Sequence, residues 1–190
     1  MSRALDVVLA TAGLIVAAPV LAVATVAIRL GSPGPAIYRQ RRVGKDGLEF
    51  DLLKLRTMVQ GSDPVGIGEA IEAGDPRITR AGAPLRRLSL DELPNLVNVL
   101  RGEMAIVGPR PTIPAQVEAY SERQRRRLEV KPGLTGWAQI NGRTSLPWED
   151  RIELDVWYVE HRSLALDLRI LARTAGLLLS GRGLYTGDKR

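Results

Sequence analysis

The stretch SLDELPN, residues 89–95, places two adjacent carboxylates, Asp91 and Glu92, at what reads as the start of a helix. A helix N-terminus offers free backbone N–H groups and the positive end of the helix dipole, which suit anions and ionised carboxylates. Apolar residues follow at helical spacing, so a buried face begins at once. They are Leu93, Leu96, Val97 and Leu100, and the cations just upstream are Arg80, Arg86 and Arg87.

The same spacing has a purely structural interpretation. Ser89 and Glu92 match a capping box, in which the Glu92 side chain only returns to bond the Ser89 N–H. Asp91 would then do no more than stabilise the first turn through the helix dipole. Pro94 weighs slightly against this alternative, because prolines favour the first turn and so suggest a helix that begins nearer Asp91. The spacing alone leaves both interpretations open.

Further motifs share one order along the chain. Residues 86–95 read RRLSLDELPN, residues 107–111 read VGPRP, and residues 131–143 read KPGLTGWAQINGR. Together they resemble the bacterial sugar transferases, the monotopic phosphoglycosyl transferases. The resemblance runs from the N-terminal apolar segment to about residue 171, and several long motifs in the same order make it specific.

This resemblance implies a reaction and its partners. Members of the family move a phospho-sugar from a UDP-sugar onto polyprenyl (undecaprenyl) phosphate, release UMP, and use Mg²⁺ with an Asp-Glu dyad. The catalytic residues would be Asp91, the nucleophile that forms a covalent phospho-sugar adduct, and Glu92, which would hold the metal. The reaction would be the first membrane step in assembling a bacterial polysaccharide or glycoprotein glycan.

Cations near the dyad are the expected phosphate ligands. Arg110 lies between Pro109 and Pro111, which hold an extended backbone, and its planar guanidinium suits phosphate oxygens. A surface arginine in a proline-rich turn is the alternative, and the resemblance favours phosphate binding. The full expected set is Lys54, Arg56, Arg86 and Arg110, with Lys54 and Arg56 on a strand where alternation could also place both in solvent.

The glycine-rich segment 131–143 is expected to wrap the nucleotide or the sugar through Gly136, Trp137, Gln139, Asn141 and Arg143. Its alternative is a packed structural loop with Trp137 as a core residue. Asp155 lies in a segment that resembles a family motif and is assigned a supporting role, as are Pro109 and Pro111. The arginines at 125–127 are interpreted as solvated or membrane-facing charges.

Composition narrows the classes of partner. The 190 residues are 45% hydrophobic, enough for one domain with a core, and the net charge is +6 with a pI of about 10.1. Such a balance fits nucleic acid, anionic lipid or phosphorylated substrates. Aromatic residues are 4% and no nucleic-acid motif occurs, so we expect no nucleic-acid partner. The chain has no cysteine and one histidine, which argues against structural zinc. A sugar-nucleotide glycosyltransferase of another type stays an alternative, although the usual Asp-x-Asp motif is absent from the sequence.

The N-terminal segment from Val7 to Ile28 carries no charge and could cross a bilayer, which takes roughly 20 residues. A signal peptide, a spanning anchor and a re-entrant helix all fit its composition. Pro19 favours a bend, and basic residues at both ends give no inside–outside asymmetry. The family breaks its re-entrant helix at a Ser-Pro pair, where this chain has Ala18-Pro19. We therefore expect a monotopic protein with its catalytic domain on the cytosolic face of the bacterial inner membrane.

Three arginines and one lysine follow that segment and are expected to contact anionic lipid headgroups, with a solvated loop as the alternative. They are Arg39, Arg41, Arg42 and Lys45. Residues 36–43 and 48–55 are expected to pair as a hairpin across an Asp-Gly turn. Residues 60–74 read as a mobile loop that could contribute to sugar choice.

The fold class is expected to be α+β, mostly helical. We expect a re-entrant membrane helix over residues 1–30, a catalytic domain over 31–180 and a mobile tail over 181–190. Helices are predicted over residues 114–128, 145–160 and 164–179. The last is amphipathic, and we expect it in the membrane interface beside Trp148 and Trp157, with core packing as an equal alternative.

Overall fold

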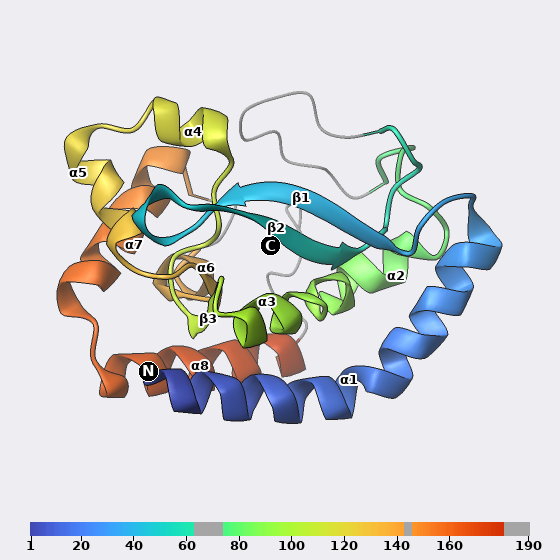
Figure 1. The fold of residues 1–190 in the computed structure, drawn as a ribbon, viewed down its shortest axis with the longest axis horizontal. Helices are drawn as coiled ribbons and strands as arrows, with labels where there is room; N and C mark the ends of the chain where they lie inside the picture. The colour runs from blue at the N-terminus through green and yellow to red at the C-terminus, as the bar shows by residue number, and fades with distance from the viewer. Residues whose placement is uncertain (63–73, 143–145, 181–190) are drawn as a thin grey trace.

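Helices surround two small sheets in the computed structural model, which describes residues 1–62, 74–142 and 146–180 (Figure 1). The elements, with short 3-10 helices labelled η, are α1 (Arg3–Gly31), β1 (Ile37–Val43), η1 (Lys45–Gly47), β2 (Glu49–Leu55), α2 (Gly82–Arg87), η2 (Leu90–Glu92), α3 (Asn95–Arg101), β3 (Ala105–Val107), α4 (Pro114–Glu118), α5 (Glu122–Arg125), η3 (Arg126–Glu129), β4 (Gly133–Thr135), α6 (Trp137–Ile140), α7 (Trp148–His161) and α8 (Leu164–Ser180). This is the expected α+β, mostly helical class.

The helix α1 is the longest element, with 29 residues and Pro19 inside it. Ser2 caps its N-terminus, and its C-terminus precedes the Ser-Pro-Gly-Pro turn. Figure 1 shows α1 running along the lower edge of the molecule and then turning upward in its second half. A bend of this kind is what a proline inside a helix produces, because it removes a backbone hydrogen bond and crowds the preceding turn.

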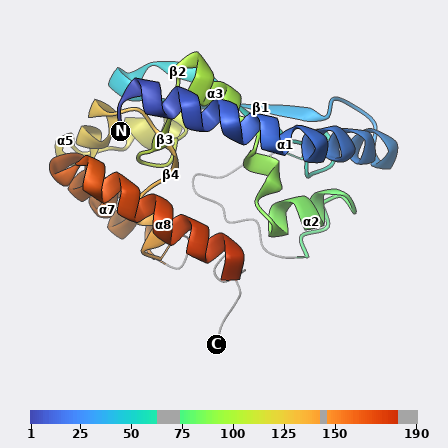
Figure 2. The same cartoon turned by 90° about the horizontal axis from the view of Figure 1, so that it is seen from below.

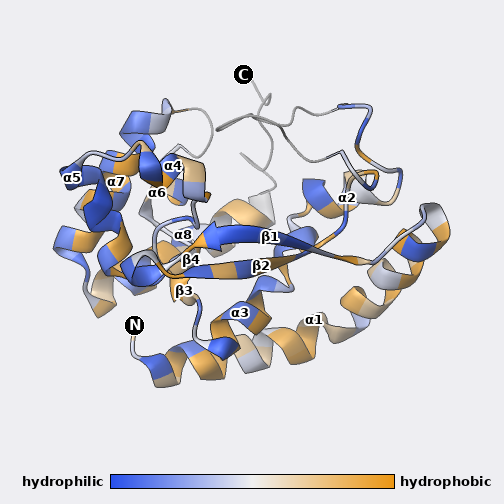
Figure 3. Cartoon of the chain, turned by 45° about the horizontal axis from the view of Figure 1, so that its top comes forward, coloured by the Kyte–Doolittle hydropathy of each residue, from blue (hydrophilic) through white to orange (hydrophobic). Residues whose placement is uncertain are grey.

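The side chains of α1 are arranged opposite to those of a soluble surface helix. Small residues face the protein, among them the buried Ala10, Ala17 and Ala24. Large apolar side chains face outward, and Val16 is 77% exposed. Figure 3 shows that apolar residues predominate along α1. An 18-residue window of α1 has a mean hydropathy of 2.5, so the helix is long and apolar enough to cross a membrane. This outward apolar face indicates association with a membrane.

The hairpin β1–β2 forms as predicted. The strands are antiparallel, with a register that runs from Ile37 opposite Leu55 to Val43 opposite Glu49. Asp46 has a φ of 57° and Gly47 a φ of 78°, conformations that an Asp-Gly turn supplies at low cost. One face of β2 packs into the main core through Phe50 and Leu52.

Asn98 ties α3 to the free edge of β2. Its Oδ1 accepts a hydrogen bond from the Leu53 N–H at 3.1 Å, and its Nδ2 donates to the Asp51 carbonyl at 2.8 Å. The side chain is fully buried, so both bonds are made in a dry environment where an unpaired amide would be costly. The turn before α3, which carries the dyad, is thereby fixed against the hairpin.

A second sheet lies in the glycine-rich segment 131–143. Strand β4 pairs in parallel with β3, with Ala105 opposite Gly133 and Val107 opposite Thr135. The backbones approach closely just beyond the strands, where a Cβ on Gly108 would lie 2.4 Å from the Lys131 carbonyl oxygen. Only glycine fits there. The segment is therefore a strand followed by α6 rather than one open loop.

Two helix predictions need correction. Residues 114–128 do not form one helix but divide into α4, α5 and η3. The division arises because Ser121 starts a new helix with a capping box to Gln124, while Tyr120 turns inward and is buried. Residues 89–95 also do not start one α-helix: Ser89 has a φ of 54°, the dyad forms the 3-10 turn η2, and α3 begins at Asn95.

The other two predicted helices form as α7 and α8. Helix α8 buries Asp167 and Ile170, and it exposes Leu164, Leu168 and Leu178. In Figure 1 α1 and α8 lie along the same lower side of the molecule, and Figure 2 shows both facing the viewer from below. The outward apolar side chains of the two helices therefore belong to one side. The expected tail at 181–190 and most of the expected mobile loop at 60–74 lie outside the described residues.

Candidate active site

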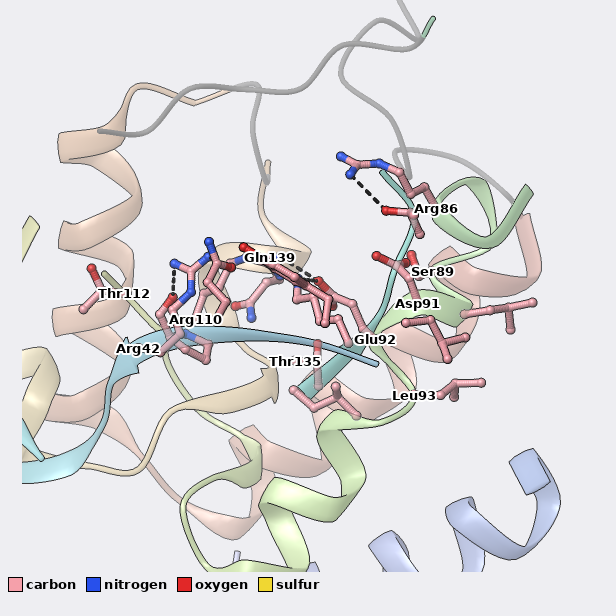
Figure 4. A pocket seen from close by; sticks show the side chains of 18 of the residues that line it. Arg42, Arg86, Ser89, Asp91, Glu92, Leu93, Arg110, Thr112, Thr135 and Gln139 are labelled. Carbon is pink, nitrogen blue, oxygen red and sulfur yellow. Dashed lines mark hydrogen bonds and ion pairs between the residues drawn. The ribbon is translucent and has the colours of Figure 1, made fainter. Parts of the chain in front are cut away.

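An open pocket with a volume of about 1510 Å³ lies between the hairpin, η2 and the segment from α6 to α8. Its size is ample for a nucleotide-sugar. Figure 4 shows Asp91 and Glu92 on one wall, with Arg42 and Arg110 beyond Glu92 and Arg86 beside Asp91. The pocket brings together most of the polar residues expected at the site, namely Lys54, Arg56, Arg86, Asp91, Glu92, Arg110, Gln139 and Asp155.

Glu92 is shared by two cations. Its Oε1 accepts a hydrogen bond from Lys54 Nζ at 2.8 Å and another from Arg110 Nη2 at 2.7 Å. Burial would raise the pKa of Glu92, but the charges of Arg110 and Lys54 and their hydrogen bonds hold it well below its usual range. Ser89 makes no side-chain capping bond. The carboxylate is therefore used for ion pairing, and the capping-box interpretation is wrong.

Asp91 lies in a different environment although it is the next residue. Within the described part of the chain, its carboxylate accepts no hydrogen bond from another residue. Burial and the negative charge of Glu92 raise its pKa, against the smaller effects of Lys54 and Arg86. A carboxylate without partners but with a raised pKa is a better nucleophile than an ordinary one, as long as it stays ionised.

The remaining cations differ in how many hydrogen bonds they already make to the protein. The Arg110 side chain is 53% exposed, so its contact with Glu92 faces the open pocket. In the described part of the chain, the one hydrogen bond of the Arg86 side chain is a long one of 3.4 Å to Thr57 Oγ1. Arg56 is buried, and its guanidinium donates to the Pro33 carbonyl and, at 2.8 Å, to the Ser32 carbonyl. Arg56 thus fastens the turn after α1, while Arg86 and Arg110 can reach a ligand.

The Pro-Arg-Pro segment is held by all three of its carbonyls. The Pro109 carbonyl accepts from the Gly133 N–H at 2.8 Å, and the Arg110 carbonyl accepts from Arg127 Nη2 at 2.9 Å. The Pro111 carbonyl accepts from Arg42 Nη1 at 3.3 Å. These bonds and the two proline rings fix the backbone that presents Arg110 to the pocket.

Asp155 acts through Arg127. Its Oδ2 accepts from Arg127 Nη2 at 2.6 Å, and its Oδ1 has no partner among the described residues. Burial raises the pKa of Asp155 to about 6, although Arg127 opposes this. Arg127 is itself buried and also donates to the Tyr120 hydroxyl. The interpretation of Arg127 as a solvated charge is therefore wrong. Its place in a run of three arginines concealed it, and its position seven residues after a tyrosine carries no recognisable signal.

Most of the expected nucleotide loop is packed against the protein. Trp137 stacks on Trp157, with ring centroids 4.8 Å apart, and borders the main core. Asn141 donates from Nδ2 to the Trp137 carbonyl at 2.8 Å, and Gly136 abuts the Gly108 backbone. Of this group Gln139 lines the pocket. Arg143 lies outside the described residues.

The dyad provides the candidate carboxylates for a metal ion. Within residues 1–62, 74–142 and 146–180, no group of three or more His, Cys, Asp and Glu side chains could hold an ion. Two adjacent carboxylates, Asp91 and Glu92, border the pocket. Mg²⁺ commonly takes one or two carboxylates together with waters and substrate phosphates, so this donor set fits it.

A carboxylate pair with cations around it, in a pocket beside an outward-facing apolar helix, defines a membrane-associated transferase of phosphorylated groups. The chain belongs to the bacterial sugar transferase family, whose model matches residues 1–181.

Similar proteins include an uncharacterised sugar transferase of Bacillus subtilis, 46% identical over 85% of this chain and 78% of that protein. A UDP-glucose:undecaprenyl-phosphate glucose-1-phosphate transferase of Caulobacter vibrioides is 44% identical over 96% and 71% of the two chains. An undecaprenyl-phosphate galactose phosphotransferase of Salmonella typhimurium is 37% identical over 97% and 42%. The expected family is confirmed.

Proposed function

We propose that this protein transfers a sugar 1-phosphate from a UDP-sugar to polyprenyl phosphate and releases UMP. The observation that carries the proposal is the asymmetry of the dyad: Glu92 is held by Lys54 and Arg110, whereas Asp91 is unpaired in a pocket rich in cations. The names of the Caulobacter and Salmonella relatives, which act on undecaprenyl phosphate, support the same chemistry.

In the first step an Asp91 carboxylate oxygen attacks the β-phosphorus, which bears the sugar. The bond from this phosphorus to the bridging oxygen breaks, and UMP leaves with the electron pair. In the second step a phosphate oxygen of polyprenyl phosphate attacks the same phosphorus. The Asp91 carboxylate is then released with the electrons of the acyl-phosphate bond, and the product is polyprenyl-diphosphate-sugar.

Repulsion between anions is the main obstacle to both steps. Arg86 and Arg110 can donate to phosphate oxygens, and Lys54 adds a further positive charge. Phosphate oxygens that enter the pocket compete with Glu92 for hydrogen bonds from Lys54 and Arg110. Glu92 would hold Mg²⁺, which when bound would supply further neutralisation of the diphosphate.

Covalent catalysis is tested by intact-protein mass spectrometry with a panel of UDP-sugars and no lipid acceptor. Wild type should gain the mass of a phospho-sugar, and addition of polyprenyl phosphate should remove it. Asp91→Asn should form no adduct, because an amide is a poor nucleophile. Asp46→Asn, which changes an exposed carboxylate in the hairpin turn, is the matched control. Release of UDP instead of UMP would refute the mechanism and favour another class of glycosyltransferase.

The membrane topology proposed for α1 is re-entrant, with both ends on the cytosolic side of the inner membrane, where nucleotide sugars are made. Both ends of the helix contact the same folded body. Near the N-terminus Arg3 donates to the Leu100 carbonyl of α3 at 2.7 Å, and after the C-terminus Ser32 is bound by Arg56. A helix that crossed the bilayer would place these ends on opposite sides.

Because the chain has no cysteine, single cysteines report topology cleanly. Cysteines at Ser2 and Pro35 should label from the same side of the membrane as one at Lys45 in the hairpin turn. Pro19→Leu should straighten α1 and shift part of the population toward spanning. Labelling of Ser2 and Pro35 from opposite sides in the wild-type background would contradict the re-entrant topology.

A further inference from the structure

Arg42 is a cation of the pocket that the proposed mechanism does not use. It lies near the end of β1, on the strand face that also carries Tyr38 and Gln40, and all three line the pocket. From the sequence it belongs to a cluster expected to contact lipid headgroups. Figure 4 instead shows its guanidinium beside that of Arg110.

The contacts of Arg42 are all to neutral atoms. Nη2 donates to Gln40 Oε1 at 2.6 Å and Nη1 to the Pro111 carbonyl at 3.3 Å, while the buried Nε has no partner among the described residues. Its neighbour Arg41, on the other face of the strand, pairs with Glu49 at 2.9 Å and Asp51 at 3.3 Å. Among the described residues, the outward arginine of this strand has two ion-pairing partners and the inward one has none.

The side chains around Arg42 carry more positive than negative charge. Lys54 and Arg110 share one carboxylate, Glu92, and in the described part of the chain Arg42 has no carboxylate within ion-pairing distance. Burial and the nearby Arg110 lower the pKa of Arg42 to about 10, so it is still charged at neutral pH. Holding a partly buried cation with no anion at ion-pairing distance is costly. The pocket is therefore arranged for an anion that comes with a ligand.

We propose that Arg42 binds, together with Arg110, the phosphate that departs with UMP. This rests on the proposed function. Glu92 lies between these two arginines and Asp91 in Figure 4, and Arg86 lies beside Asp91. With the β-phosphorus at Asp91 and near Arg86, the α-phosphate extends toward Arg42 and Arg110. That phosphate gains negative charge as the bridging bond breaks, so guanidinium donors there stabilise the leaving group.

The test measures UMP affinity without turnover, by calorimetry on the full chain in nanodiscs, with uridine as the ligand that lacks the phosphate. Arg42→Gln should weaken UMP binding ~10-fold or more, the usual range for hydrogen bonds to a charged group, and leave uridine binding unchanged. The UMP affinity of Arg42→Lys should lie between those of wild type and Arg42→Gln, because lysine keeps the charge but lacks the planar guanidinium fork. Arg41→Gln, the matched control on the outer strand face, should bind both ligands as wild type does.

A positioning role for Arg42 is the competing explanation, since it also bonds the Pro111 carbonyl. If Arg42 only oriented Arg110, then Arg42→Gln would have no further effect on UMP affinity in an Arg110→Gln background. Direct contact predicts a further loss there. Unchanged UMP affinity in Arg42→Gln, or no further loss in the double variant, overturns the proposal. Release of UMP from UDP-sugar by wild type with polyprenyl phosphate is a separate measurement, so failure of the proposed function would show in that assay and not in the affinity comparison.

Discussion

Two arginine–carboxylate pairs line the same pocket and differ in almost every physical respect. Glu92 has two cationic partners, one of them half in solvent, and its pKa is lowered. Asp155 has one cationic partner, both side chains are buried, and its pKa is raised to about 6. The first pair can exchange a carboxylate for a phosphate at little cost. The second cannot open without leaving a charge in the protein interior, so it serves the structure.

Breaking the buried pair should have the largest effect. Arg127→Leu leaves Asp155 unpaired and removes the bond to the Arg110 carbonyl, so we expect about 3–5 kcal/mol less stability. Thermal unfolding in detergent measures this. Arg127→Leu combined with Asp155→Leu should recover much of the loss. If the single variant unfolds like wild type, the buried pair has no structural role.

Glu92→Gln tests the exchangeable pair. Loss of the carboxylate should slow UMP release about 100-fold, in the range seen when one electrostatic group of an active site is removed. Excess Mg²⁺ should restore part of the rate if the carboxylate holds the metal. Stability should fall less than in Arg127→Leu, because the Arg110 side chain is half exposed and water can replace its partner. A large loss of stability in this variant would make the two pairs alike.

The pH dependence of stability should separate the pairs by sign. An unfolded Asp has a pKa of about 3.9, whereas folded Asp155 has a pKa of about 6, so the folded state holds this proton more tightly. The contribution of Asp155 therefore falls by roughly 3 kcal/mol as pH rises through that window. The lowered pKa of Glu92 acts oppositely: its contribution is present above its unfolded pKa and is lost as the solution is acidified further. Asp155→Asn should remove the loss between pH 4 and 6 in unfolding titrations, and persistence of that slope would assign it elsewhere.

Arg110→Lys should give the smallest of these effects. The charge and the ion pair with Glu92 can remain, but the planar fork that contacts two phosphate oxygens is lost. We expect UMP release to slow ~10-fold, the equivalent of one charged hydrogen bond, with unfolding unchanged. Arg123→Lys, a change on an exposed ion pair far from the pocket, is the control. Activity equal to wild type would favour the alternative in which Arg110 is a surface residue of a proline-rich turn and does not bind phosphate.

Features that depend on neighbours in sequence were predictable. The apolar run around Pro19, the Asp-Gly hairpin and the helices α7 and α8 each follow from local patterns, and the family motifs brought Asp91, Glu92 and Arg110 into one site. The partners of Glu92 were not predictable, because Lys54 and Arg110 reach it across 38 and 18 residues of chain. Local spacing instead suggested a capping box, which the long-range ion pairs displaced.

Local sequence also does not predict whether a charged side chain faces solvent or the interior of the protein. Arg41 and Arg42 are adjacent letters in one basic cluster, and only the pairing of β1 with β2 sends one to solvent and the other into the pocket. Arg127 is similarly hidden among three arginines until Asp155 and Tyr120 are brought to it by the fold. Strand β4 was obscured by Gly133 and by Gly136 just after it, because these glycines are needed for the close backbone approach and weaken any strand signal.

The two faces of α1 tolerate different substitutions, because one packs against the protein and the other is exposed. On the inner face space is tight: a Cβ at Gly13 would lie 3.1 Å from a Leu96 methyl group, and Leu96 belongs to the helix that follows the dyad. Enlarging that face would displace α3 and, with it, the turn that carries Asp91 and Glu92. On the outer face Val16 and Val23 are mostly exposed, so valine, isoleucine and leucine can replace one another there with little effect on the packing of the protein. A lineage can thus tune this helix to a thicker, thinner or more fluid bilayer by drift on one face, while the other face keeps the chemistry constant.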